Sequence, residues 1–118
     1  MSRPNEPDEL PIFVKWMDFT EWLLVTTGKF PRQARFSFAQ RIEGLALDVV
    51  EDLVEARYSR DKRAILKRAN LRLEKMRVLL RLSHNLHFVS HQSYEHAAKN
   101  INEVGRMLGG WSKQQEEP

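Results

Sequence analysis

The sequence has 118 residues, with 19 basic and 16 acidic side chains, four histidines and no cysteine, and a formal net charge of +3. This length suits one domain with its own core, and the lack of cysteine excludes disulfides and thiolate metal sites. No apolar run approaches the roughly 20 residues of a membrane span, and the acidic, proline-rich start differs from a signal or transit peptide. A cytoplasmic protein with no membrane partner is expected.

The first predicted helix covers residues 11–27 and follows residues 1–10, a polar segment expected to be a disordered tail. Pro11 suits the first turn of a helix and Gly28 suits a helix end. Apolar residues recur at helical spacing, and they are Ile12, Phe13, Trp16, Leu23 and Leu24.

A connector at residues 28–32 precedes the second predicted helix, residues 38–58. Ser37 followed by Gln40 has the spacing of a capping box, which favours a helix start there. The apolar face consists of Phe38, Ile42, Leu45, Val49, Leu53 and Ala56. An acidic group in the second half, expected to meet solvent or the basic third helix, consists of Asp48, Glu51, Asp52 and Glu55.

A third helix is predicted within residues 57–87, which lack Gly and Pro, with Ser59 or Asp61 as its cap. Ten basic residues between Arg57 and Arg81 are opposed by only two acidic ones. A broad apolar face consists of Ile65, Ala69, Met76, Leu79, Leu80 and Leu86. An offset second stripe consists of Leu71, Val78 and Leu82. Either this stripe faces a partner subunit or another protein, or both stripes form one wide core-facing surface.

After a break at residues 88–90, Ser90 can cap a fourth helix over residues 91–108. Its apolar face consists of Tyr94, Ala97, Ile101, Val104 and Leu108. Gly109 and Gly110 predict the end of this helix.

Trp111 is expected to fold back onto the bundle, and residues 114–118 are expected to form a flexible tail. Four amphipathic helices with short connections predict an all-α protein, an antiparallel up-down-up-down four-helix bundle over residues 11–113.

Metal and catalytic signatures are weak. No Glu is followed by His three residues later, as the ligand pairs of ferritin-like di-iron sites require. His84, His87 and His91 follow helical steps, but the spacing crosses the predicted break and no nearby carboxylate is set to complete a shell, which favours ordinary surface histidines. Phosphate-loop, dinucleotide and nucleophile-elbow motifs are absent. We therefore predict no metal, no cofactor and no catalytic residue, and hence a non-enzyme.

The basic third helix is the remaining functional candidate. Lys and Arg on a rigid helix can neutralise phosphates with salt-dependent affinity, whereas the aromatic residues do not interleave with the basic run as a stacking platform would require. Alternatively, these charges solvate the helix and pair with the acidic second helix. Charge alone nominates Lys67, Arg68 and Arg72 for binding nucleic acid or an acidic partner.

Three groups of residues carry a resemblance to a known family. They are FPR at 30–32 with RFS at 35–37 and QRI at 40–42, LLRLS at 79–83 with Leu86, and YE at 94–95 with EVGRMLGGW at 103–111. Over roughly residues 12–113 the chain resembles the Avd family, the accessory variability determinants of diversity-generating retroelements. That family is related to the four-helix proteins encoded by ribosomal-RNA intervening sequences. The GRMLGGW ending is the most specific piece, while the FPR connector is shared with the wider group.

The resemblance implies a four-helix bundle that assembles into a homopentameric barrel with a basic surface. Such proteins bind the retroelement's reverse transcriptase and nucleic acid, including template RNA and cDNA, as non-catalytic partners in mutagenic retrohoming. By position, the resemblance adds Arg77, Arg81 and Arg106 to the binding candidates. Gly105 is expected to let a neighbouring helix or aromatic ring approach closely.

A homo-oligomeric protein-interaction scaffold without nucleic-acid binding is the alternative function. In that case the stripe of Leu71, Val78 and Leu82 serves as the oligomer interface.

Overall fold

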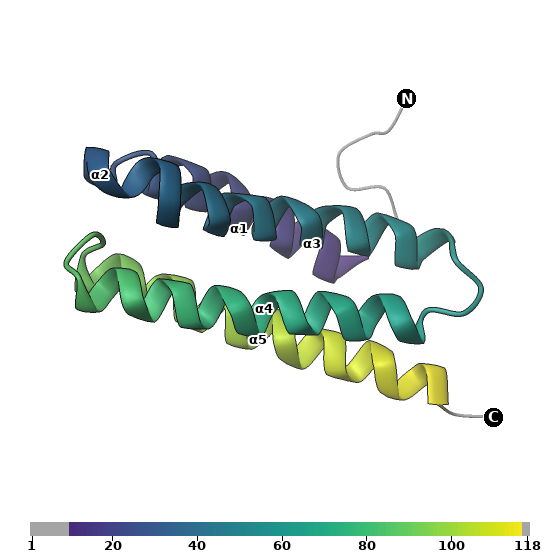
Figure 1. Cartoon of the computed structure of the whole chain (residues 1–118). Coiled ribbons are helices and arrows are strands. Elements are labelled where there is room, and N and C mark those ends of the chain that lie inside the picture. The colour runs from purple at the N-terminus through teal and green to yellow at the C-terminus, as the bar shows by residue number, and fades with distance from the viewer. Residues whose placement is uncertain (1–9, 117–118) are drawn as a thin grey trace.

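Amphipathic segments that cannot bury an apolar face alone pack here into a four-helix bundle, which confirms the predicted fold class (Figure 1). The structure, a computed structural model, describes residues 10–116. In chain order, its elements are α1 (Pro11–Thr27), α2 (Arg32–Ala34), the π-helix η1 (Arg35–Ala39), α3 (Gln40–Tyr58), α4 (Arg63–Asn85) and α5 (His91–Glu116).

Each long helix packs against two others, so the four form a closed square around one core. α1 contacts α3 and α5, and α4 likewise contacts α3 and α5. The largest fully buried side chains are Trp16, Phe30, Leu23, Ile42, Leu53, Leu66, Leu73, Met76, Ile101, Leu108, Val49 and Val104. Trp16 also donates a buried hydrogen bond from Nε1 to the carbonyl oxygen of Ala46 at 2.9 Å, which ties α1 to α3.

The predicted apolar faces are largely confirmed, with two exceptions. Leu24 stays exposed because it is rotated by about 100° from the buried Leu23. Leu86 is exposed because α4 ends at Asn85, so the following turn no longer follows the helical face.

Local signals at two helix ends, Gly28 and Ser90, act as predicted. α1 covers residues 11–27, and the N–H of Gly28 donates to the Leu24 carbonyl at 3.1 Å. Ser90 Oγ accepts the N–H of Ser93 at 3.1 Å at the start of α5. Neither candidate cap of α4 occupies its N-cap position, which is Lys62 without a side-chain cap hydrogen bond, although the preceding Asp61 accepts the N–H of Arg63 at 3.2 Å.

The second helical segment begins earlier than predicted. Ser37 is not a helix cap, because the chain is already helical from Arg32 and Ser37 lies inside η1. Ala34 and Ala39 are buried, so residues 32–39 contribute to the core and this packing keeps the segment helical.

The predicted end of the fourth helix at Gly109 and Gly110 is wrong, because α5 continues to Glu116. Two glycines disfavour a helix by about 1 kcal/mol each relative to alanine. Trp111 packs against the core from within the helix rather than by folding back, and this contact offsets that cost. Gln114 to Glu116 of the expected C-terminal tail are therefore helical, whereas residues 1–9 and 117–118 of the two expected tails lie outside the described residues.

Candidate functional site

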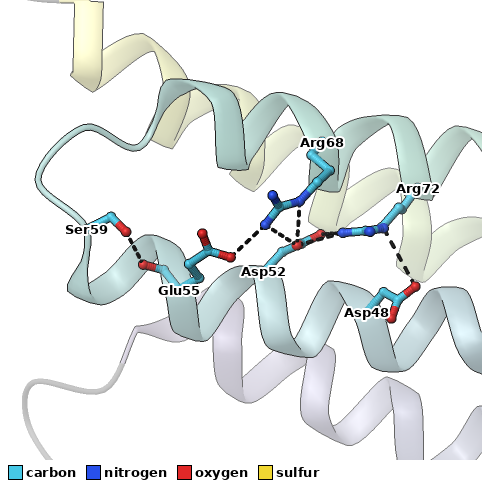
Figure 2. A network of polar contacts seen from close by, with 6 residues as sticks. All are labelled: Asp48, Asp52, Glu55, Ser59, Arg68 and Arg72. Carbon is cyan, nitrogen blue, oxygen red and sulfur yellow. Dashed lines mark hydrogen bonds and ion pairs between the residues drawn. The ribbon is translucent and has the colours of Figure 1, made fainter.

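Arg68 and Arg72, two of the predicted binding residues, turn toward α3 and hold a buried carboxylate (Figure 2). Asp52, whose side chain is only 3% exposed, accepts a hydrogen bond from Arg68 Nε at 2.9 Å. Arg72 Nη1 donates to both oxygens of Asp52, at 2.7 and 2.6 Å. At the rim, Arg68 Nη2 donates to Glu55 Oε1 at 2.7 Å, and Arg72 Nε lies 3.8 Å from Asp48 Oδ2. We call these five residues the Asp52 clasp.

The Asp52 clasp forms because its members share faces of two adjacent helices. Asp48, Asp52 and Glu55 recur at four- and three-residue intervals on α3, and Arg68 and Arg72 are four residues apart on α4. The hydrogen bond to Asp52, followed by that to Glu55, raises the pKa of the Arg68 guanidinium. Guanidinium groups already paired with carboxylates offer less positive potential to a phosphate, so these two arginines are weaker binding candidates than charge counting suggests.

Arg77 and Arg81 lie on the other side of α4 and line a hollow of about 340 Å³ between α4 and α5. Tyr94 and Asn102 contribute to the same lining. Arg77 Nε donates to Asn102 Oδ1 at 3.1 Å, and its Nη1 pairs with Glu74. Arg81 is exposed and has no ion-pair partner in the part of the chain that the structure describes. Glu74 lines the same hollow, but its carboxylate pairs with Arg77 and not with Arg81.

Gly105 of α5 makes room for the Arg77 guanidinium. A Cβ at Gly105 would lie 3.1 Å from Arg77 Nη2 and 3.9 Å from Leu73 Cδ1. The glycine thus permits the expected close approach of a neighbouring helix, although the group that approaches is an arginine and not an aromatic ring.

Lys67 lines a second hollow between α4 and α5, of about 390 Å³, together with Asn70, Gly109 and Ser112. Gly109 leaves this hollow open, because no atom lies within 4 Å of the position that its Cβ would take. Lys67 is exposed, with no ion-pair partner among the described residues. The two hollows therefore place basic groups at two points between the same pair of helices.

Arg106 extends this basic surface along α5, one helical turn beyond Asn102. The neighbouring Glu103 is engaged by Lys15 of α1, at 2.9 Å between Nζ and Oε1. This hydrogen bond is the main cause that lowers the pKa of Glu103, and the charges of Arg106 and Lys99 contribute less. Arg106 is exposed on α5. We call Lys67, Arg77, Arg81 and Arg106 the α4–α5 basic seam.

Charge is divided unevenly between the two halves of the bundle. Residues 10–58 carry six basic and seven acidic side chains, whereas residues 59–116 carry 12 basic and five acidic ones. Two of those 12, Arg68 and Arg72, pair with carboxylates in the Asp52 clasp, and the four residues of the α4–α5 basic seam are not part of that clasp. The positive charge of the protein is therefore concentrated on α4 and α5.

A basic row on α5 was missed by reasoning from charge density along the chain. Lys99, Arg106 and Lys113 recur every seven residues, and all three are exposed. Seven residues are close to two helical turns, so they lie along one face of α5. The seven-residue spacing of these three basic residues indicates a shared helix face, but the predicted binding residues included only Arg106.

Leu71, Val78 and Leu82, the predicted oligomer interface, remain exposed in the single chain at 54%, 50% and 43%. This exposure excludes the alternative in which both stripes of α4 form one core-facing surface. Val78 also lines a hollow of about 750 Å³ between α3 and α4, beside Gly44 and Leu45.

Two histidines meet at the turn between α4 and α5. His84 Nε2 and His91 Nδ1 lie 3.2 Å apart, and His84 stacks on Tyr94. One carboxylate lies beside this pair, with Glu95 Oε2 3.4 Å from His91 Nε2, one turn away on α5. Within residues 10–116, no group of three or more His, Cys, Asp or Glu side chains is placed to hold a metal ion.

Comparison with known proteins gives one positive result. No curated protein matches the chain at a significant level. Within the described residues, no helix is long and apolar enough to cross a membrane. The family described as bAvd-like matches residues 12–115, nearly the same segment that carries the resemblance to the Avd family, and thereby confirms that resemblance. Avd-like proteins are accessory, non-catalytic proteins. The chain therefore belongs to the bAvd-like family and is, at the level of that family, an accessory protein of diversity-generating retroelements.

Proposed function

We propose that this protein binds reverse transcriptase and nucleic acid, template RNA or cDNA, in the cytoplasm and thereby supports mutagenic retrohoming without catalysing a reaction itself. The observation that carries the proposal is the α4–α5 basic seam, where Arg81 faces a hollow beside Arg77 with no described carboxylate partner of its own. Family membership supplies the biological setting.

The seam suits contact with a phosphate backbone more than base recognition. Guanidinium and ammonium groups on rigid helices can each neutralise a phosphate, and binding then releases counterions. If the four seam residues each contact one phosphate of a single strand, the logarithm of the affinity should fall with the logarithm of salt concentration with a slope of about −3. Affinity should therefore depend strongly on salt and weakly on sequence.

Self-assembly would strengthen the positive electrostatic potential of the α4–α5 basic seam. We propose that Leu71, Val78 and Leu82 contact a neighbouring copy and that the assembly is a homopentamer, in keeping with the family resemblance. Burial of three half-exposed aliphatic side chains favours association by the hydrophobic effect. Each copy carries only +3, so a ring would combine several basic seams on one particle.

Fluorescence anisotropy with a short labelled RNA tests the nucleic-acid half of the proposal. Charge reversal by Arg77→Glu or Arg81→Glu should weaken binding and reduce the salt slope, while far-UV circular dichroism stays unchanged. Arg60→Glu is the matched control, because Arg60 is exposed in the α3–α4 connection, away from the seam. Absence of RNA binding by the unmodified protein even at low salt would refute this half.

Co-purification of the tagged protein with the reverse transcriptase of the same retroelement tests the other half. The two proteins should elute together from a size-exclusion column, and separate elution at micromolar concentrations would contradict the proposal.

A protein-interaction scaffold is the second candidate, favoured by the exposed strip of Leu71, Val78 and Leu82. It predicts an oligomer without affinity for nucleic acid. Light scattering tests the proposed self-assembly, and Val78→Glu should yield a smaller particle than the wild type. A wild-type monomer at micromolar concentration would contradict an oligomer interface at this strip in both candidate functions.

A further inference from the structure

The π-helix η1 shifts the helical register by one residue where the chain passes from the FPR connector into the bundle. Ile42 is fully buried, and an uninterrupted α-helix would place Arg35, two turns earlier, on the same core-facing side. The wider π turn accommodates one additional residue. The buried residue is consequently Ala34, eight positions before Ile42, and Arg35 is exposed.

Phe36, also within η1, lies on the surface and is 79% exposed. Other rings at this end of the bundle pack together: Phe88 lies 6.2 Å from Phe30 and 5.4 Å from Phe38 between ring centroids. Phe36 takes part in no ring contact among the described residues. Most of its ring surface is therefore accessible to a ligand.

Basic side chains flank Phe36, with no acidic residue between Glu21 and Glu43. Lys29, Arg32 and Arg35 are all exposed, and none has an ion-pair partner within residues 10–116. Arg35 Nε donates to the carbonyl oxygen of Phe30 at 3.2 Å, which anchors that guanidinium on the connector.

We propose that Phe36 stacks on an unpaired base of a single-stranded nucleic acid, while Lys29, Arg32 and Arg35 hold the adjacent phosphates. The proposal rests on the proposed function and specifies its substrate: a strand with exposed bases rather than a duplex. A base within a duplex is covered on both faces by its neighbours, whereas an unpaired base can stack on an aromatic ring irrespective of its identity.

The same surface suits a protein partner less well. Protein interfaces bury a contiguous apolar centre with a polar rim, but Phe36 is the single large exposed apolar side chain between Gly28 and Ala46. One isolated ring among cations fits the combination that single-strand binders use, in which aromatic stacking accompanies a positively charged track.

Anisotropy titrations with a labelled single strand and with its duplex test the proposal. Phe36→Ala should weaken single-strand binding at least about fivefold and leave duplex binding unchanged. Phe36→Trp should preserve the affinity because it retains an aromatic face, whereas Phe36→Leu, apolar but without a ring, should lose it. Far-UV circular dichroism of each variant verifies that the bundle remains folded.

Tyr58→Ala is the matched control, because Tyr58 has the same 79% exposure at the opposite end of α3. One face of its ring is occupied by the Arg57 guanidinium, 5.7 Å from the ring centroid. An equal loss in Tyr58→Ala, or an equal loss for single strand and duplex in Phe36→Ala, would overturn the proposal.

Two further outcomes separate this proposal from the proposed function. If Arg81→Glu weakens binding and Phe36→Ala does not, the stacking contact is refuted while the α4–α5 basic seam stands. If Phe36→Ala leaves single-strand affinity intact but releases the reverse transcriptase, Phe36 is a protein contact and the stacking proposal is wrong.

Discussion

Replacing Asp52 by Asn should destabilise the protein by about 2–3 kcal/mol. Asp52 accepts three hydrogen bonds from two guanidinium groups, and a hydrogen bond to a charged group contributes about 1.5–3 kcal/mol. The amide has nearly the same shape, leaves no cavity and retains one accepting oxygen. Partial exposure of Arg68 (43%) and Arg72 (26%) weakens the interaction further. The expected loss is a large part of the roughly 5–15 kcal/mol that stabilises a typical domain.

Urea unfolding followed by circular dichroism measures this loss. Glu51→Gln removes the same charge from an exposed neighbouring position of α3 and should change the free energy of unfolding by less than about 0.5 kcal/mol. If Asp52→Asn costs no more than Glu51→Gln, the Asp52 clasp does not stabilise the fold. Because Asp52→Asn also releases Arg68 and Arg72, the variant should bind RNA more tightly although it is less stable.

Three other substitutions test separate parts of the structure. Gly109→Ala should raise the free energy of unfolding by up to about 1 kcal/mol, because its Cβ would meet no atom within 4 Å; a lower Tm would contradict a helix through this position. Gly105→Ala should leave stability within about 1 kcal/mol, because Arg77 can move aside, but should weaken RNA binding in anisotropy titrations. The pKa of Glu103, measured by NMR titration, should lie below its ordinary value and return toward it in Lys15→Met. A depressed carboxyl pKa adds stability that is present above the unfolded-state pKa and is lost as pH falls through the folded-state pKa. An unchanged Glu103 pKa in Lys15→Met would rule out the Lys15–Glu103 pair as the cause of the lowered pKa.

Local chemistry was sufficient to predict much of the fold from the sequence. Pro11 and Gly28 mark the ends of α1, and helical periodicity identified most of the core. The predictions from Ser37 and Gly109 were wrong because packing overrides their local preferences. The buried Ala34 keeps the segment before Ser37 helical, and Trp111 packs against the core beyond the two glycines and stabilises the end of α5. Such contacts depend on residues far apart in the chain, which periodicity does not report.

The candidate site was only partly predictable for a similar reason. Charge density on the third helix and the family resemblance together selected the four residues of the α4–α5 basic seam. They also selected Arg68 and Arg72. The ion pairs of these two arginines with Asp52 depend on how α3 is rotated about its axis relative to α4. Phe36 was not predicted because neither apolar periodicity nor charge density singles out one exposed aromatic ring.

The wide turn at Arg35–Ala39 also has consequences for how relatives of this chain can differ in length. Deleting one residue within α3 would rotate everything before it by about 100° and turn core side chains toward solvent. Deleting one residue within η1 would instead convert the π turn into an ordinary α-helix and place Ala34 two turns before Ile42, still on the core side. A one-residue gap between related sequences is therefore compatible with an unchanged core at this segment, whereas the same gap in the middle of α3 would demand compensating changes throughout the bundle.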